Sequence, residues 1–377
     1  MPDDLTSEYS GIADAREHLR EVRDRGVAWL LERIGDDGRP AHADEHHGYY
    51  RFPWTLAYVG ERERAAAVMS WIERKTLTDD GDLRDGVARA AWTTDAATYP
   101  LTIIAQGAWV LESFDTANAV METLRRDFVD PVTGGAYRER PEARATGYQM
   151  SFATAQLGST ALTTGQTDLA DGAFAFFQRV MAAQPDLPGT LYPVWGREGL
   201  VTEFDETYHY NALIDFSKPM QAFHNPGIAA GFLARYSQMH GNAEAKALAS
   251  ALIALNEQGT AEQFNYAESS GICKLGLGSA MLLDIDPDPR LVRNIKRMIR
   301  WYADAQRPDG AWIHRTPNRP ENPPEAFVME KTAEHVLWLS MMLTSLARYE
   351  ASMHGETAIV NQLQGRPVSS GTLNKEI

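Results

Sequence analysis

The chain has 377 residues, of which 44% are hydrophobic, and a formal net charge of −15. This composition provides enough apolar surface for a large core, and the charge disfavours nucleic acid or an anionic membrane surface as a partner. The one cysteine, Cys273, excludes an internal disulfide and a cysteine-based metal site. The chain shows no apolar run approaching the roughly 18 residues of a membrane span and no signal-peptide pattern in its opening residues, so a cytoplasmic location is expected.

In chain order, six segments with the apolar spacing of an amphipathic helix each end in a turn that contains glycine. The segments are 15–34, 65–77, 118–128, 174–183, 247–256 and 294–306, and the turn glycines are Gly38, Gly81, Gly135, Gly189, Gly259 and Gly310. After each turn, a polar and aromatic stretch leads into a second helix rich in Ala, Gly and Leu. These second helices are expected at approximately 52–59, 95–112, 148–163, 220–240, 273–284 and 329–349.

A single helical hairpin cannot bury its apolar face, so the six hairpins must stack on one another. Because the second helices are rich in small residues, they can line the inside of a ring, and we expect an all-α (α/α)6 toroid rather than an open α-solenoid. Residues 1–355 are expected to form this one domain. The alternation in LYPVWGREGLVTEF indicates a β-hairpin or lid within an insertion at 185–219, and the polar tail 356–377 is expected to be a strap or disordered.

In such a toroid, the long turns bring the N-termini of the inner helices to the centre, where free N–H groups and helix dipoles favour anions and oxyanions. The candidates for proton transfer are His209, His224, His335 and Glu330. The candidates for substrate binding are Tyr50, Trp54, Trp92, Asp95, Tyr99, Tyr148, Trp195, Tyr210, Asp215, Lys218, Asn225 and Lys274. Tyr49, Arg51 and Lys331 lie in the same stretches.

Several candidates also have a purely structural interpretation. His224 is placed to cap a helix, His335 to be a satisfied core histidine, and Asp215 to form a local Asx-turn. Most individual Trp and Tyr residues belong to the core in such a pattern. Cys273 is expected to be a small buried residue rather than a nucleophile.

No metal or cofactor is expected. His42 and His46 would share a face only in a helix, but their segment directly follows GDDGRP, where a turn is expected. The chain contains no GxSxG, HExxH, Walker or GxGxxG string.

Some motifs resemble those of known toroids. NPGIAAGFLARYSQMHGN, DPVTGG with AYRE, and EKTAEHVLWL resemble the N-acylglucosamine 2-epimerase family, whereas RPDGAW and WLLERIGDDGRP resemble turns of terpenoid cyclases. The epimerase resemblance implies two catalytic histidines; His335 matches the second, and Ile228 stands in place of the first, four residues after His224. The cyclase resemblance implies a DxDD acid motif, and the nearest string, which contains Asp284 and Asp286, lies on a short turn at the opposite end of the ring.

The function that these observations favour is a metal-independent acid–base enzyme, whether isomerase, lyase or hydrolase, that acts on a small neutral sugar-like or polyol substrate. One alternative is a terpenoid-cyclase-like enzyme that uses an acid such as Asp95 and an aromatic cavity. The other is a non-catalytic helical scaffold, whose polar residues would face bulk water. The expected partner is a small molecule, with a homodimer possible.

Overall fold

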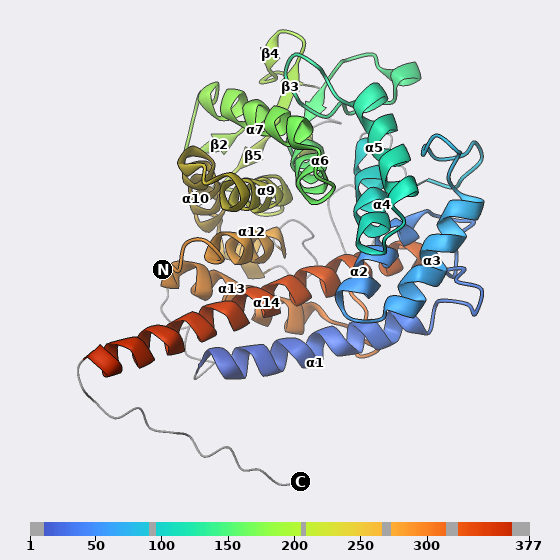
Figure 1. Cartoon of the computed structure of the whole chain (residues 1–377). Coiled ribbons are helices and arrows are strands. Elements are labelled where there is room, and N and C mark those ends of the chain that lie inside the picture. The colour runs from blue at the N-terminus through green and yellow to red at the C-terminus, as the bar shows by residue number, and fades with distance from the viewer. Residues whose placement is uncertain (1–10, 90–95, 205–208, 266–272, 314–322, 364–377) are drawn as a thin grey trace.

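The structure, a computed structural model, describes residues 11–89, 96–204, 209–265, 273–313 and 323–363, and it consists mainly of two concentric sets of helices (Figure 1). The outer helices are α1 (Ile12–Leu31), α3 (Arg62–Lys75), α5 (Phe114–Phe128), α7 (Thr167–Ala182), α10 (Ala243–Glu257) and α13 (Pro289–Ala305). The inner helices are α2 (Phe52–Tyr58), α4 (Thr98–Val110), α6 (Ser151–Thr163), α9 (His224–His240), α12 (Cys273–Leu283) and α14 (Glu325–Leu363). Short helices in the connections are η2 (Gly48–Arg51), η4 (Pro141–Ala143), α8 (His209–Ala212) and α11 (Ala261–Asn265).

The ring is closed. Each inner helix contacts the inner helix before it and the one after it, and α14 contacts both α12 and α2. On the outside, α1 packs along α14, so the first and last hairpins lie side by side (Figure 1). The expected (α/α)6 toroid is therefore confirmed, and the open solenoid is not.

Burial explains why the two sets of helices differ in sequence. The outer helix α13 buries Leu291, Ile295 and Met298 along one stripe, as a helix with one face in water does. The inner helix α4 is buried at every residue from Thr98 to Ala108 and contains no charged residue. An inner helix lies between the outer layer and the other inner helices, so most of its side chains are apolar on every side of the helix. Small residues are needed where the backbones of neighbouring helices approach each other.

Four of the long turns share one geometry. In each, the residues that flank the turn form an isolated antiparallel bridge, such as Ile34 with Pro40. A glycine with positive φ lies inside the turn, for example Gly38 with φ of 83°, and faces the backbone of the next outer helix, here Ala67 of α3. The third turn uses Gly134 in this role instead of the expected Gly135. These turns therefore fix the spacing between neighbouring hairpins.

Gly38→Ala is expected to lower the free energy of unfolding by about 2 kcal/mol. The backbone strain adds to an overlap between the new methyl group and the Ala67 carbonyl. Gly60→Ala is the matched control, because Gly60 has φ of 95° and a methyl group added there would have nothing within 4 Å, so only the strain of about 1 kcal/mol applies. Urea denaturation measures both. Equal losses of unfolding free energy in the two variants would show that contact between the turn and α3 does not contribute to stability.

The expected β-hairpin is confirmed. Strands β3 (Val194–Gly196) and β4 (Gly199–Leu200) are antiparallel, with Trp195 opposite Leu200. Strand β1 (Gln149–Met150), directly before α6, pairs with the other side of β3, and β2 (Thr190–Leu191) pairs with β5 (Ile214–Asp215). The insertion is thus attached to the start of an inner helix, and its action as a lid stays a prediction.

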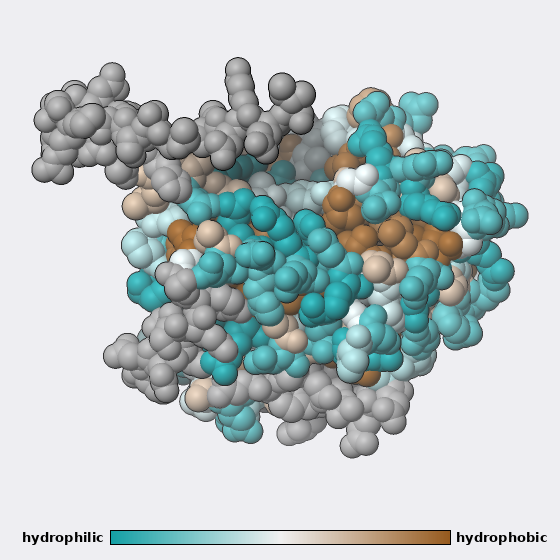
Figure 2. Space-filling view, turned by 90° about the horizontal axis from the view of Figure 1, so that it is seen from below, coloured by the Kyte–Doolittle hydropathy of each residue, from teal (hydrophilic) through white to brown (hydrophobic). Residues whose placement is uncertain are grey.

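Helices α2 and α12 begin where they were expected, and α4, α6 and α9 begin three or four residues later. Helix α14 begins earlier than expected, at Glu325, and continues to Leu363. The helix therefore extends past Glu356, where the tail was expected to begin. Among the helices that the structure describes, none has the length and apolarity to cross a bilayer. Figure 2 shows the molecule from below, a face that is mainly hydrophilic, with its largest hydrophobic area right of centre.

Candidate functional site

The candidate site is centred on buried charged side chains near the N-terminal ends of inner helices. The members of this group, called the charged cluster below, are Arg51, Lys274, Glu330, Lys331 and Glu334. Arg51 ends η2 directly before α2, and Lys274 is the second residue of α12. Glu330 and Glu334 lie one helical turn apart on the same face of α14, so both carboxylates reach the centre.

Glu334 connects three parts of the chain. Its Oε2 accepts a hydrogen bond from Arg51 Nη2 at 3.2 Å and lies 3.3 Å from Lys331 Nζ. Its Oε1 pairs with Lys274 Nζ. The Glu334 residue is 2% exposed, and a carboxylate buried to this extent requires charged partners. Desolvation by burial lowers the pKa of Lys274.

Glu330 is surrounded by donors. Tyr50 Oη donates a hydrogen bond to Glu330 Oε1 at 2.9 Å, and Lys331 Nζ lies 3.2 Å from the same oxygen. His46 Nε2 lies 3.7 Å from Oε2. Burial, and then the charge of Glu330, raise the pKa of Tyr50 well above its ordinary value, so this phenol stays protonated and acts as a donor.

Aromatic rings surround Arg51. Its Nη2 donates to Tyr99 Oη at 3.3 Å, and the guanidinium carbon lies 5.5 Å from the ring centroids of Tyr99 and Trp338. Trp338 makes an edge contact with Trp54 at 5.9 Å between centroids. The expected residues Tyr50, Trp54 and Tyr99 are therefore brought together with Lys274 and Glu330 at one place.

A chain of ring contacts continues around the same end of the toroid. Tyr99 contacts Phe152 at 5.6 Å between centroids, and Phe152 contacts His224 at 5.4 Å. His224 is the first residue of α9, and Asn225 Nδ2 lies 3.4 Å from His224 Nε2. The first turns of α4, α6 and α9 thus present an aromatic and imidazole surface beside the charged cluster.

His335 is fully buried next to Glu334 on α14. The Tyr302 and Trp312 rings make edge contacts with it at 5.1 and 5.5 Å between centroids. Desolvation by burial, followed by the nearby positive charge of Lys274, holds the pKa of His335 well below its ordinary value. The imidazole is therefore neutral in the folded protein at neutral pH.

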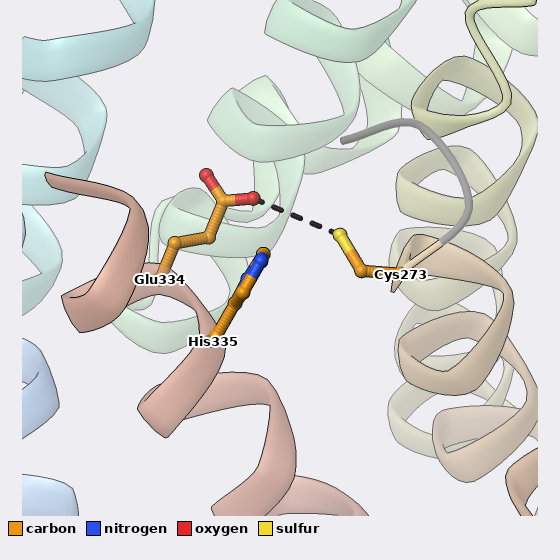
Figure 3. Close-up of side chains that lie close together, drawn as sticks. All are labelled: Cys273, Glu334 and His335. Atoms are coloured by element: carbon orange, nitrogen blue, oxygen red, sulfur yellow. Dashed lines mark hydrogen bonds between the residues drawn. The ribbon is translucent and has the colours of Figure 1, made fainter. Parts of the chain in front are cut away.

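Cys273, Glu334 and His335 converge (Figure 3). One potential ligand atom from each lies within 4.8 Å of the others, and Cys273 Sγ is 3.9 Å from Glu334 Oε1. However, Lys274 Nζ pairs with Glu334 and lies 3.1 Å from Cys273 Sγ. A divalent cation would sit against this ammonium group in a medium of low dielectric constant, so the group does not fit a metal.

The protonation of two buried histidines predicts how the stability of the fold depends on pH. Burial, and then the charge of His46, lower the pKa of His47 from 6.5 to about 3, and the pKa of His335 is also lowered. Below pH 6.5 the unfolded chain therefore binds more protons than the folded one, and stability falls as the pH falls.

We expect His47→Gln and His335→Gln each to reduce the slope of unfolding free energy against pH by about 0.7 kcal/mol per pH unit at pH 6.5, and by about 1.3 kcal/mol per pH unit at pH 5. Urea denaturation across this range measures the slope. The exposed His240, changed to Gln, is the control. A slope that neither buried substitution alters would contradict the neutral state of both histidines.

The remaining candidates lie in several places. Tyr148 and Trp195 are half-buried beside the paired strands β1 and β3. Asp215 accepts a hydrogen bond from Ser217 N at 3.0 Å and pairs with the exposed Lys218 at 2.9 Å, which is the geometry of a local Asx-turn. Trp92 and Asp95 lie outside the described residues, as do the side chains of His209 and Tyr210.

The sequence-based candidates did not include Glu334 or His46, although the spacing of four residues from Glu330 to Glu334 could have indicated the former. His46 Nδ1 accepts a hydrogen bond from Gly48 N at 2.8 Å, which orients its other nitrogen toward Glu330. His42 has φ of 56° and contacts Glu45 at 3.0 Å, so its segment forms the expected turn.

No protein-family profile matches the chain, and neither does any curated protein. Solved structures, by contrast, include many with a similar fold. An α-mannanase of glycoside hydrolase family 76 from Bacteroides thetaiotaomicron has a TM-score of 0.60 at 12% identity, covering 88% of this chain and 96% of that one.

Two further structures have the same TM-score of 0.58. A D-mannose isomerase is 10% identical and covers 89% of this chain and 99% of its own. A type II terpene cyclase from Scytonema, in complex with geranylgeranyl dihydroxybenzoate, is 13% identical and covers 88% and 99%. This fold is the (α/α)6 toroid of these enzymes, and at such low identity the likeness establishes the fold alone.

Proposed function

We propose that the chain is a metal-independent acid–base enzyme that acts on a small sugar-like or polyol substrate at the charged cluster. The observation that carries this function is the union of a neutral imidazole, a protonated phenol and several cations in one buried network. The similarity in fold to a D-mannose isomerase and an α-mannanase supports sugar chemistry on this scaffold.

The roles follow from the protonation states. His335 is neutral and therefore able to accept a proton from a substrate carbon next to a carbonyl group. The phenol of Tyr50, oriented by Glu330, is a hydrogen-bond donor for the carbonyl oxygen. Lys274 stabilises the negative charge that develops on that oxygen when the proton leaves. Return of the proton to the same carbon from the opposite face gives an epimer. Return of the proton to the former carbonyl carbon, with transfer of the neighbouring hydroxyl proton to the former carbonyl oxygen, gives the aldose–ketose isomer.

Burial of the charged groups favours this function over a passive scaffold. Arg51 and Glu330 are 0% exposed, whereas a scaffold that binds through its surface would keep such groups in water. The aromatic set around Arg51 favours a second candidate, a cyclase for a prenylated aromatic acid, since a type II terpene cyclase shares the fold. The density of paired charges favours the acid–base function over the cyclase.

The test uses the full chain in D2O with a panel of aldoses and ketoses, followed by NMR. We expect deuterium to enter a substrate carbon, and His335→Gln or Glu330→Gln to slow this exchange roughly 10²–10⁴-fold. His240→Gln, on the exposed end of α9, is the matched histidine control and keeps the wild-type rate.

His224→Ala and His209→Ala test the other candidate histidines in the same assay. Full exchange in both would remove them from the mechanism and leave His335 as the base. Full exchange in His335→Gln would contradict the role of His335 as the base. Cyclisation of a prenylated aromatic acid without any exchange into sugars would instead establish the cyclase.

A further inference from the structure

Among the described residues, the charged cluster consists of three cations, Arg51, Lys274 and Lys331, and two carboxylates, Glu330 and Glu334, so these five side chains carry one positive charge in excess. The neighbouring groups do not remove this excess. His47 and His335 are neutral, and the phenol of Tyr50 stays protonated. An uncompensated charge in a buried site is costly unless a ligand pairs with it.

Both carboxylates already contact cationic or hydrogen-bond-donating side chains of the site. Glu334 is shared among Arg51, Lys274 and Lys331. Glu330 accepts from Tyr50 and lies beside Lys331 and His46. The negative groups of the cluster are thus already engaged by several donors each.

Arg51 has hydrogen-bond donors that no described residue accepts. Its Nη2 makes the contacts with Tyr50, Tyr99 and Glu334. Its Nε and Nη1 are buried and have no hydrogen-bond partner within the described part of the chain. A guanidinium group is always protonated, so these donors are permanently available for an acceptor that the protein itself does not provide.

We propose that Arg51 binds a carboxylate group of the substrate, so that the substrate class is a sugar acid or similar hydroxy acid rather than a neutral sugar. This substrate class rests on the acid–base function proposed above. A carboxylate carries a single negative charge and matches the single excess charge of the cluster. A phosphate monoester carries about 1.5–2 negative charges at pH 7 and would leave a buried negative charge uncompensated. The aromatic rings of Tyr99 and Trp338 flank the guanidinium and exclude water from the pair.

Matched ligand pairs test this inference by calorimetry: glucuronate with glucose, mannuronate with mannose, and galacturonate with galactose, plus glucose 6-phosphate. We expect at least one uronate to bind roughly 10- to 100-fold more tightly than its neutral partner, and Arg51→Met to abolish that difference. Arg51→Lys keeps the charge but loses donors, and is expected to recover only part of it. Arg20→Met, on the exposed face of α1, is the control and preserves the difference.

Thermal unfolding of Arg51→Met separates ligand binding from a structural role. Removing one of three cations leaves the cluster neutral, so the melting temperature is expected to stay near that of the wild type. A large fall would show that Arg51 serves mainly to hold Glu334, and would overturn the inference. Preferential binding of the sugar phosphate, or equal binding of uronates and neutral sugars, would also overturn it.

Cys273 provides one more decisive outcome, because Lys274 Nζ lies 3.1 Å from its sulfur. A thiolate at pH 7, seen as ultraviolet absorbance that Cys273→Ser removes, would itself neutralise the cluster and overturn the inference. The deuterium assay keeps the two proposals distinguishable. Exchange into neutral sugars without uronate preference refutes only the carboxylate, whereas uronate binding without exchange refutes only the acid–base function.

Discussion

Glu334→Ala is expected to lower the free energy of unfolding by about 3–5 kcal/mol, because it leaves buried cations without their shared carboxylate. Arg51 and Lys331 lie 3.2 and 3.3 Å from Glu334, and Lys274 pairs with its other oxygen. Urea denaturation at pH 7 measures the loss. Glu325→Ala is the matched control on the same helix, since Glu325 forms a partly exposed pair with Arg33 and is expected to cost at most about 1 kcal/mol.

A second substitution identifies the cause. Adding Lys274→Met to Glu334→Ala removes the carboxylate together with one of the cations that paired with it. We expect the double variant to be more stable than Glu334→Ala alone. If the double variant were instead less stable, lost packing rather than stranded charge would explain the effect of Glu334→Ala.

Gly227→Ala is expected to destabilise the fold by about 3 kcal/mol and to disturb the site, because the new methyl would meet rigid backbone. A Cβ at Gly227 would lie 2.6 Å from the carbonyl carbon and oxygen of Lys274, at the start of α12. Separation of α9 and α12 would then move Lys274 away from Glu334. Urea denaturation measures the stability, and the deuterium assay reports the site.

Gly231→Ala is the control one turn further along α9. The nearest atoms to a Cβ there belong to Met281 and Leu277, at 3.7 and 3.8 Å, which is ordinary contact. Because alanine favours a helix more than glycine does, this variant is expected to equal or exceed the wild type in stability. A loss as large as that of Gly227→Ala would mean that helix α9 rejects alanine for a reason other than contact with α12.

Much of the fold could be predicted from the sequence because each repeat unit contains a recognisable local sequence pattern. A glycine in a turn and a largely buried helix after it recur in each hairpin, and both have a direct physical cause. The choice between Gly134 and Gly135 could not be predicted, since either residue can adopt positive φ and only the backbone of α7 next to the turn decides. The extra length of α14 was also missed, because polar residues do not end a helix by themselves.

The site was predictable only in part. Tyr50, Lys274 and Glu330 were identified because they directly precede or begin inner helices, and the toroid brings those ends together. Asp215 and Lys218 lie in an irregular loop, where sequence alone does not tell whether two opposite charges pair with each other or face the centre. They pair with each other at 2.9 Å. Glu334 was missed because its role depends on cations contributed by η2 and α12, which are distant in sequence.

Closure of the ring has a consequence for when the charged cluster forms during synthesis of the chain. The hydrogen bond from Tyr50 to Glu330 joins residues 280 positions apart, and that from Arg51 to Glu334 joins residues 283 apart. The site is therefore built across the seam between the first hairpin and the last. A chain still emerging from the ribosome can stack its early hairpins but cannot assemble the cluster until α14 has been synthesised and docked. The complete cluster thus requires the whole ring, and a partly folded chain lacks it.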